Sequence, residues 1–303
     1  MARIFIDGDS GTTGLEIRER LEGRGGIEIV SIAPEHRKDP QAKRELLASV
    51  HLAILCLPDD AAREVAALCD ALGDSAPRLL DASTAHRVAP GWVYGFAELA
   101  ADQPRKIAAA RRVANPGCYA TGAIALLAPL VKGGLIAPDA PLTINAISGY
   151  SGGGKKMIEA YEAGAAPPFE LYALGLEHKH LPEIVAHSGL ARAPLFVPSV
   201  GNFRQGMLVS IPLWLEELPG RPKAAELAAA LARHYADAKW VKSRPAPGER
   251  LDATALKGSD EMELFVFANE AKRQAALVAR LDNLGKGASG AAVQNLELML
   301  GFA

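Results

Sequence analysis

Short apolar runs alternate with helical segments along the first third of the chain. The run from Arg3 to Asp7 predicts a buried strand, and apolar residues at helical spacing predict a helix that begins near Thr13. Further predicted strands cover Ile27 to Ile32, Leu52 to Leu57 and Leu79 to Asp81, and the last two flank an Ala-rich helical stretch from Asp60 to Leu72. Because strands that alternate with helices form βαβ units, this region predicts an α/β fold with a doubly wound parallel sheet.

Beyond residue 118 the pattern changes to longer strands of alternating polarity. These cover Leu142 to Ile147, Met207 to Leu215, Met262 to Val266 and Ala275 to Leu281. Alternation of this kind is typical of a mostly antiparallel sheet with helices on one face. The last segment, Ala288 to Leu300, has one apolar helical face that we expect to pack back onto the first domain.

Composition narrows the class of protein. A chain of 303 residues, 49% of them hydrophobic, is long enough for two domains with substantial cores. A formal charge of -2 without any Lys/Arg block argues against nucleic acid or an anionic membrane surface as the main partner. No apolar run approaches the ~18 to 20 residues that span a bilayer, and no signal segment is evident, so we expect a cytoplasmic protein with free thiols.

A glycine turn lies between the first predicted strand and the first predicted helix. Glycine lets a backbone approach a pyrophosphate closely, and the helix N-terminus offers free N–H groups with a partial positive charge. The spacing is GxxGxxG rather than the commoner GxGxxG, and a tight turn without any ligand is the alternative interpretation. The predicted cofactor-binding residues of this turn are Gly8, Ser10, Gly11, Thr12, Thr13 and Gly14.

The residues after the second predicted strand bear on the choice of cofactor. An NAD site usually has an acidic residue there to bind the ribose 2'-hydroxyl, whereas this chain has Ser31 and Ile32. Arg37 and Lys38 follow and can neutralise a 2'-phosphate, which favours NADP(H). A solvated basic loop is the alternative, and Glu35 beside it is compatible with that interpretation.

The segment around Cys118 carries the sharpest chemical signal. It runs from a short strand through a Pro-Gly turn to Cys118 at the head of an apolar helix. Free amides and the helix dipole stabilise a thiolate, which makes Cys118 a candidate nucleophile, and they can also stabilise an oxyanion on an attacked carbonyl. The alternative for any single cysteine is an inert core residue, and we prefer that interpretation for Cys56 and Cys69.

The segment EHKHLPEI offers a partner base for such a thiol. His178 and His180 stand two residues apart, and Glu183 follows close enough to orient an imidazole ahead of a helix that begins near Pro182. Alternate histidines also occur as metal ligands, but no third ligand of suitable spacing is evident, so no metal site is predicted. The remaining histidines look unremarkable.

At this point the chain resembles the N-acetyl-γ-glutamyl-phosphate reductases of arginine biosynthesis, in their shorter form, over nearly its whole length. The segments that carry the resemblance are DGDSGTTG, LLDASTAHR, WVYGFAEL, ANPGCYATG, ISGYSGGGKK, EHKHLPEI, PSVGNFRQGM and LDNLGKGASGAAVQNLELMLG. NPGCYAT and HxHxPE are the most specific of them. The resemblance implies a Rossmann-type domain over residues 1–117, completed by a C-terminal helix over 285–303, and a catalytic and dimerising α+β domain over 118–284.

The resemblance also implies roles for individual residues. Cys118 would be the nucleophile and His180 the acid/base, with Asn115 supporting the cysteine loop and Glu183 orienting His180. Asn283 would lie near the nicotinamide. The implied substrate site comprises Ser148, Gly149, Tyr150, Ser151 and Gly152, and Lys155, Lys156 and Arg204 are candidate cations for the phosphate or else solvated surface charges.

The implied reaction is NADPH-dependent reduction of an acyl phosphate to an aldehyde through a Cys118 thioester, by a homodimer or homotetramer. Three alternatives stay open. One is a related acyl-phosphate reductase such as aspartate-semialdehyde dehydrogenase, and a second is a Cys-His hydrolase. The third is a dinucleotide-binding sensor without catalysis, which the presence of Cys118, His180 and Glu183 disfavours.

Overall fold

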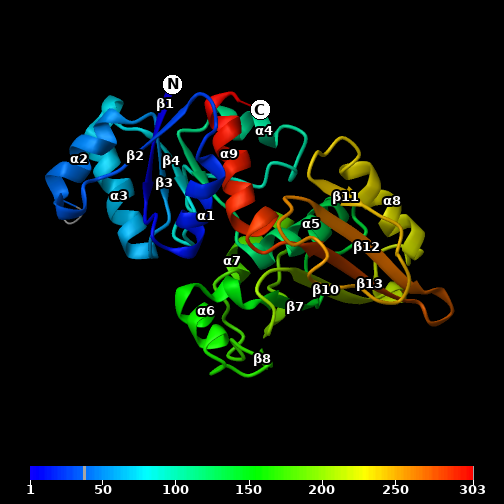
Figure 1. The fold of residues 1–303 in the computed structure, drawn as a ribbon. Helices are drawn as coiled ribbons and strands as arrows, with labels where there is room; N and C mark the ends of the chain where they lie inside the picture. The colour runs from blue at the N-terminus through cyan, green and yellow to red at the C-terminus, as the bar shows by residue number, and fades with distance from the viewer. Residues whose placement is uncertain (37–38, 303) are drawn as a thin grey trace. The chain divides into compact units, whose positions relative to one another are not determined.

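A computed structural model describes residues 1–36 and 39–302 of the chain. The chain divides into two compact units (Figure 1). Unit 1 comprises residues 1–97, 102–116 and the C-terminal segment from Ala288, and unit 2 comprises residues 98–101 and 117–287. Arg37 and Lys38 lie outside the described residues.

Within the described residues, unit 1 contains one six-stranded parallel sheet with the order β2-β1-β3-β4-β6-β5. Its strands are β1 (Ala2–Asp7), β2 (Ile27–Val30), β3 (Leu52–Leu55), β4 (Arg78–Asp81), β5 (Val93–Tyr94) and β6 (Arg112–Ala114). Successive side chains of a strand point to opposite faces, so Ile4 and Ile6 enter one apolar core and Phe5 enters another. The predicted doubly wound parallel sheet is confirmed.

Helices cover both faces of this sheet. They are α1 (Thr12–Leu21), α2 (Pro40–Ser49), α3 (Asp59–Leu72), α4 (Gln103–Ala109) and α9 (Gly290–Leu300), with short 3-10 turns η1 (Pro34–His36) and η2 (Gly73–Ser75). Apolar residues of α1 and α9 pack on the face that carries Ile4, and those of α2 and α3 pack on the face that carries Phe5. The expected return of the C-terminal helix to the first sheet is therefore present.

The described residues of unit 2 contain a seven-stranded mixed sheet with the order β11-β12-β13-β10-β7-β9-β8. Its strands are β7 (Thr143–Gly149), β8 (Phe169–Leu171), β9 (Leu195–Gly201), β10 (Met207–Trp214), β11 (Val241–Ser243), β12 (Met262–Asn269) and β13 (Gln274–Leu281). Only the pairs β7/β9 and β11/β12 among these strands are parallel, so the predicted mostly antiparallel sheet is confirmed.

The helices of unit 2 are α5 (Cys118–Lys132), α6 (Lys155–Glu162), α7 (Leu181–Ser188) and α8 (Ala224–His234), with 3-10 turns η3 (Tyr150–Gly153), η4 (Leu215–Glu217) and η5 (Glu270–Lys272) and a π turn η6 (Gly285–Ser289). Helix α5 is apolar on nearly all sides because it packs on strands β10 and β13 as well as on α7 and α8. A Cβ at Gly122 would lie 2.8 Å from the Val209 side chain, so this glycine lets α5 approach the sheet closely. In the described residues no helix combines the length and apolar character needed to cross a membrane.

Candidate active site

Cys118 is the first residue of α5, and Gly117 precedes it in extended conformation as the N-cap. Gly117 has no side chain that can cap the amides of the first turn. The Gly117 carbonyl accepts hydrogen bonds from the Thr121 amide at 2.8 Å and from Thr121 Oγ1 at 2.9 Å, which anchors the start of the helix. The sulfur is therefore attached at the positive end of a long apolar helix, where the dipole favours an anion.

Glu183 connects the cysteine loop with the predicted acid/base. It lies in the first turn of α7, is 1% exposed, and accepts a hydrogen bond through Oε2 from the Gly117 amide at 3.1 Å. Its other oxygen, Oε1, lies 3.9 Å from Nε2 of His180, the residue that precedes α7. One buried carboxylate thus faces both the backbone next to Cys118 and the His180 imidazole.

His178 has a different environment from His180. Its Nδ1 accepts a hydrogen bond from the His180 amide at 3.1 Å, and its ring packs edge-on against Tyr119, Tyr172 and Phe196. Because Nδ1 accepts a hydrogen bond there, His178 holds the backbone of His180. The structure therefore separates the two histidines, and His180 is the one beside the Glu183 carboxylate.

Two tyrosines line the same region with neutral hydroxyls. Tyr172 donates a hydrogen bond to the Tyr119 hydroxyl at 3.2 Å, and Tyr119 donates to the Ser199 carbonyl at 2.9 Å. Burial raises the pKa of both phenols well above the usual value. They form the rigid wall beside the two histidines and remain protonated at neutral pH.

The predicted substrate residues lie where β7 runs into η3, and the structure joins them to Asn283. Asn283 donates through Nδ2 to Ser151 Oγ at 2.9 Å and accepts from the Gly206 amide through Oδ1 at 2.9 Å. Both polar atoms of this amide therefore bind the protein. A Cβ at Gly149 would lie 2.5 Å from the Arg204 carbonyl oxygen, so only glycine fits there.

The other members of this predicted set surround that junction. Ser148 donates to the Gly149 carbonyl at 3.0 Å, and a Cβ at Gly152 would lie 2.9 Å from Ser148 Oγ. The Tyr150 ring stacks on Tyr161 with centroids 4.9 Å apart. These contacts form a tightly folded segment in which the Ser151 hydroxyl accepts a hydrogen bond from Asn283.

The candidate cations for phosphate lie on the surface of unit 2. The Lys155 side chain is 78% exposed at the start of α6 and its ammonium lies 3.9 Å from Glu159. Arg204 donates to Glu162 at 2.5 Å. Lys155 and Arg204 therefore each face a carboxylate on α6, and Lys156, the third candidate, is an exposed residue of the same helix.

The glycine turn of unit 1 has the backbone geometry that its sequence predicts. Gly8 has φ +91°, and a Cβ there would lie 2.3 Å from the Cys56 carbonyl oxygen. A Cβ at Gly14 would likewise lie 2.3 Å from the Gly8 carbonyl oxygen. A pocket of about 150 Å³ opens at the end of β1 and is lined by Phe5, Ile6, Asp7, Gly8, Asp9, Ser10, Ser31, Ile32 and Leu57. This cradle beside the start of α1 fits a dinucleotide phosphate.

A cation that the sequence analysis missed lies at the same end of the sheet. Arg18 of α1 donates to Ser31 Oγ at 2.7 Å and to Asp9 Oδ2 at 2.8 Å. Ser31 follows β2, where a dinucleotide-binding fold holds the ribose. The available signal was spacing, because Arg18 lies four residues after Gly14 and hence on the same helix face.

Asn115, the residue expected to support the cysteine loop, is bound on every side within unit 1. Its amide donates to the Asp81 carbonyl at 2.7 Å, and its carbonyl accepts from Arg87 Nε at 3.0 Å. Its side chain accepts from Asn295 Nδ2 at 3.0 Å and donates to the Ala288 carbonyl at 3.0 Å. The segment that leads to Pro116 is thereby anchored to β4 and to the C-terminal segment.

His86 is more constrained than its sequence context suggested. It is buried, its Nδ1 lies 2.6 Å from Asp81 Oδ2, and its ring stacks on Trp92 at 4.0 Å. The Asp81 carboxylate also accepts from the amide and hydroxyl of Ser83 at 2.9 and 2.7 Å. This network shapes the turn that carries Arg87 toward the Asn115 carbonyl.

Of the other two cysteines, Cys69 is buried in one apolar core of unit 1 and Cys56 packs partly buried against the other. Burial raises the pKa of Cys56 to about 12 and that of Cys69 to about 11. Both therefore stay protonated near neutral pH. Across the described parts of the chain, no group of three or more His, Cys, Asp or Glu side chains has the geometry to hold a metal ion.

Close relatives identify the family. The chain is 52% identical to N-acetyl-gamma-glutamyl-phosphate reductase 2 of Pseudomonas putida over 98% of this chain and 96% of that protein. It is 53% identical to the N-acetyl-gamma-glutamyl-phosphate reductase of Chelativorans sp. over 99% of this chain and 98% of that protein. The chain belongs to the N-acetyl-γ-glutamyl-phosphate reductase family. The family model for the semialdehyde dehydrogenase dimerisation domain also matches residues 118–283.

Solved structures with the same fold extend this likeness beyond the reductase family. Aspartate semialdehyde dehydrogenase II of Vibrio cholerae, complexed with ASA, has a TM-score of 0.72 at 14% identity and covers 99% of this chain and 98% of its own. The corresponding enzyme of Francisella tularensis has a TM-score of 0.73 at 12% identity and covers 99% of this chain and 100% of its own. At such low identity the likeness establishes the shared α/β fold.

Proposed function

We propose that this reductase converts N-acetyl-γ-glutamyl phosphate to N-acetylglutamate 5-semialdehyde and phosphate, with NADPH as electron donor and a thioester on Cys118. The observation that carries the chemical proposal is the Glu183 carboxylate, which bonds the Gly117 amide at 3.1 Å and faces His180 Nε2 at 3.9 Å. This carboxylate connects the N-terminus of the helix that carries the proposed nucleophile to the proposed acid/base residue. The names of the reductases at 52 and 53% identity support the choice of substrate.

The first step forms the thioester. His180 takes the thiol proton of Cys118, whose sulfur bonds to the acyl carbon while the carbon–oxygen bond to phosphate breaks. The phosphate leaves with that electron pair and accepts the proton from His180. The amides at the start of α5 are the proposed hydrogen-bond donors that stabilise the transient negative charge on the oxygen of the attacked carbonyl.

The second step releases the aldehyde. NADPH, when bound, supplies a hydride to the thioester carbon. The resulting oxyanion on the Cys118 adduct collapses, so the carbon–sulfur bond breaks and the sulfur recovers its electron pair. Proton exchange through His180 then restores the resting thiol and imidazole, with one solvent proton consumed per turnover.

Residues of unit 1 support NADP(H) as the cofactor. The glycine turn offers a cradle for the pyrophosphate, with Gly11, Thr12 and Thr13 opening α1. Ser31 in place of an acidic residue leaves room for a 2'-phosphate, and Arg18 at 2.7 Å from Ser31 Oγ provides a charge beside it. Arg37 and Lys38 remain predicted contributors.

The decisive assay runs the reaction backwards. Purified protein with N-acetylglutamate 5-semialdehyde, phosphate and NADP+ should form NADPH only when all three are present. Aspartate semialdehyde in the same assay should be a poor substrate. Faster turnover of aspartate semialdehyde would contradict the proposed substrate. Hydrolysis without nucleotide turnover would contradict the proposed reductase activity, and a higher kcat/KM with NAD+ would contradict the proposed NADP(H) preference.

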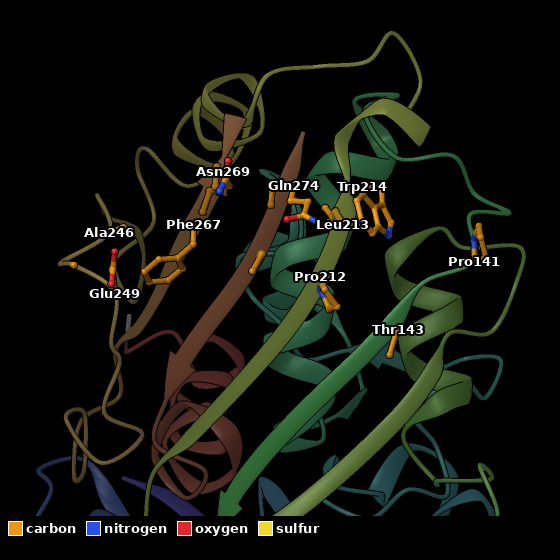
Figure 2. A pocket seen from close by; sticks show the side chains of 15 residues that line it. Pro141, Thr143, Pro212, Leu213, Trp214, Ala246, Glu249, Phe267, Asn269 and Gln274 are labelled. Carbon is orange, nitrogen blue, oxygen red and sulfur yellow. The ribbon is translucent and has the colours of Figure 1, made fainter. Parts of the chain in front are cut away.

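We also propose that the protein forms homodimers or larger homo-oligomers through the exposed face of the sheet in unit 2. Along β10, the buried residues Met207, Val209, Ile211 and Leu213 alternate with Leu208, Ser210, Pro212 and Trp214 on the other face. Trp214 is 53% exposed. A groove of about 870 Å³ lies on this side, and Figure 2 shows Pro212, Trp214 and Phe267 projecting from the strands that line it.

Two observations favour a second copy of this chain as the partner on this face: the face continues beyond the groove, and the matching family model describes a dimerisation domain. A second hollow of about 510 Å³ continues the same face past Leu208 and Val278 to the exposed Phe169 and Leu171. Exposed apolar residues gathered on one continuous face mark a site of protein–protein contact. The matching family model describes residues 118–283 as a dimerisation domain.

Light scattering on a sizing column tests this proposal. The wild-type protein should elute with two or four times the chain mass, and the variant Trp214→Glu/Phe267→Glu should elute with the mass of one chain. The control Val88→Glu changes an exposed apolar residue of unit 1 and should leave the mass unchanged. A wild-type monomer would overturn the proposal.

A further inference from the structure

Unit 2 contains a buried ion pair between two residues far apart in the sequence. The Lys286 ammonium lies 2.7 Å from Glu98 Oε2, and the two side chains are 2% and 6% exposed. A buried lysine is costly unless its charge is compensated, so breaking such a pair from one side is strongly unfavourable. The two residues are 188 positions apart, which means that this pair joins distant parts of the chain.

Lys286 stands between two glycines whose backbone is tightly packed. A Cβ at Gly287 would lie 3.0 Å from Cys118 Cβ and 3.4 Å from Cys118 Cα, so the chain at Gly287 lies directly against the nucleophile. A Cβ at Gly285 would lie 2.1 Å from the Ser259 carbonyl oxygen. The three residues belong to the π turn η6, a rare geometry that occurs frequently at functional sites.

Glu98 is anchored in turn to the helices that support Cys118. His234 Nε2 of α8 donates to the Glu98 carbonyl at 3.1 Å. The neighbouring Tyr235 donates through its hydroxyl to the Ala125 carbonyl of α5 at 2.9 Å, and α5 is the helix that begins at Cys118. The contacts therefore close a ring from Cys118 through α5, α8, Glu98, Lys286 and Gly287 back to Cys118.

We infer that Lys286 and Glu98 form a positioning pair, which fixes the backbone at Gly287 against Cys118 and so holds the sulfur in the orientation for attack. The inference rests on the proposed role of Cys118. Lys286 acts through Gly287 and contacts neither substrate nor cofactor in this role. Misplacement of a reacting group by about 1 Å can cost on the order of 10²-fold in rate, so loss of the pair should slow the reaction strongly.

The test compares Lys286→Met, Glu98→Gln and the double variant Lys286→Met/Glu98→Gln with the wild type. The readouts are kcat, KM for both substrates, the melting temperature, and the rate at which iodoacetamide alkylates Cys118, followed by mass spectrometry of the peptide that carries it. Alkylation needs neither substrate nor nucleotide, so it tests the pair even if the proposed reaction fails. Lys106→Met, which breaks an exposed pair with Asp102, is the matched control.

We expect each single variant to lower kcat and the alkylation rate of Cys118 by about 10²-fold with unchanged KM, as for a misplaced reacting group. The double variant removes both buried charges, so it should recover the melting temperature while kcat and alkylation stay low. It should be no slower than either single variant, because the two residues act together. Wild-type kcat and alkylation in the folded double variant, or multiplicative losses from the two single changes, would overturn the inference.

Discussion

Glu183 accepts a hydrogen bond from the backbone amide of Gly117 at 3.1 Å and so connects α7 to the residue that precedes Cys118. This bond is buried, and the other oxygen of the carboxylate lies 3.9 Å from the His180 imidazole. The structural contact of Glu183 and its proposed catalytic role can therefore be separated by the choice of substitution.

Glu183→Gln should keep the hydrogen bond to Gly117 and lose the charge. We expect near wild-type stability with kcat lowered by roughly 10- to 100-fold, the equivalent of a charged hydrogen bond worth about 1.5 to 3 kcal/mol. Glu183→Ala should also lower the free energy of unfolding by about 1 to 3 kcal/mol, because the Gly117 amide loses its acceptor. Urea denaturation and steady-state kinetics measure the two effects, with the exposed Glu216→Gln as control. Equal kcat in Glu183→Gln and wild type would exclude a role for the charge.

Cys118→Ser should abolish turnover while folding and NADPH binding stay intact. A serine hydroxyl at this position does not ionise near neutral pH, so it cannot form the acyl intermediate at a useful rate. Quenched reactions of the wild type with the acyl phosphate, without nucleotide, should show the acyl mass on the peptide that carries Cys118. Wild-type turnover by Cys118→Ser would remove the thioester from the mechanism.

His180→Asn should lower kcat by about 10²- to 10⁴-fold, the usual contribution of a positioned acid/base. His178→Asn should affect stability instead, because the His178 ring accepts a hydrogen bond from the His180 amide at 3.1 Å and packs among aromatic side chains. We expect that change to lower the melting temperature more than His180→Asn does. Stopped-flow measurement of phosphate release isolates the acylation step. An unchanged acylation rate in His180→Asn would show that another group takes the proton from Cys118.

Arg18→Met should lower kcat/KM for NADPH by roughly 10- to 100-fold through the loss of a charged contact worth about 1.5 to 3 kcal/mol. The value for NADH should change much less, because NADH lacks the 2'-phosphate. Arg63→Met, which removes an exposed pair with Asp60, is the control. Equal losses with both nucleotides would assign Arg18 to the structure of the turn.

Cys56 should make the protein less stable at alkaline pH. Burial raises the pKa of its thiol from 9.0 to about 12, so the folded protein keeps the proton to higher pH than the unfolded chain does. Stability from this group is complete below pH 9 and falls by about 1.4 kcal/mol per pH unit as the pH rises toward 12. Urea denaturation at pH 8 and pH 10 should show a smaller loss in Cys56→Ala than in the wild type. An identical loss in both would contradict the assignment.

The spacing of apolar residues predicted the main helices and strands, because each of them buries one side chain after another at the spacing of its own secondary structure. The first helix was expected near Thr13 and begins at Thr12, and the strand expected from Arg3 begins at Ala2. Strand β9 was missed, since Pro198 lies in its middle and proline within an apolar run argues against a central strand. Strand β8 was missed because it has only three residues.

The site itself was predictable only where its residues are close in sequence or match a known motif. Cys118, His180 and Glu183 each had such a local signal. Lys286 had none, because a lysine in sequence looks like a solvated charge and its partner Glu98 lies 188 positions away. The contact between Gly287 and Cys118 is likewise a product of tertiary packing that no local pattern encodes.

The C-terminal helix α9 contributes Ala292, Val293, Leu296 and Met299 to the same apolar core as Ile4 and Ile6 of the first strand. During synthesis, a nascent chain that has emerged only as far as Gly287 already contains all of unit 2 but lacks this helix. The core of unit 1 can therefore be complete only after α9 has been synthesised, whereas unit 2 needs no residue beyond Gly287. Unit 1 begins first along the chain, yet unit 2 is the first to have all of its residues.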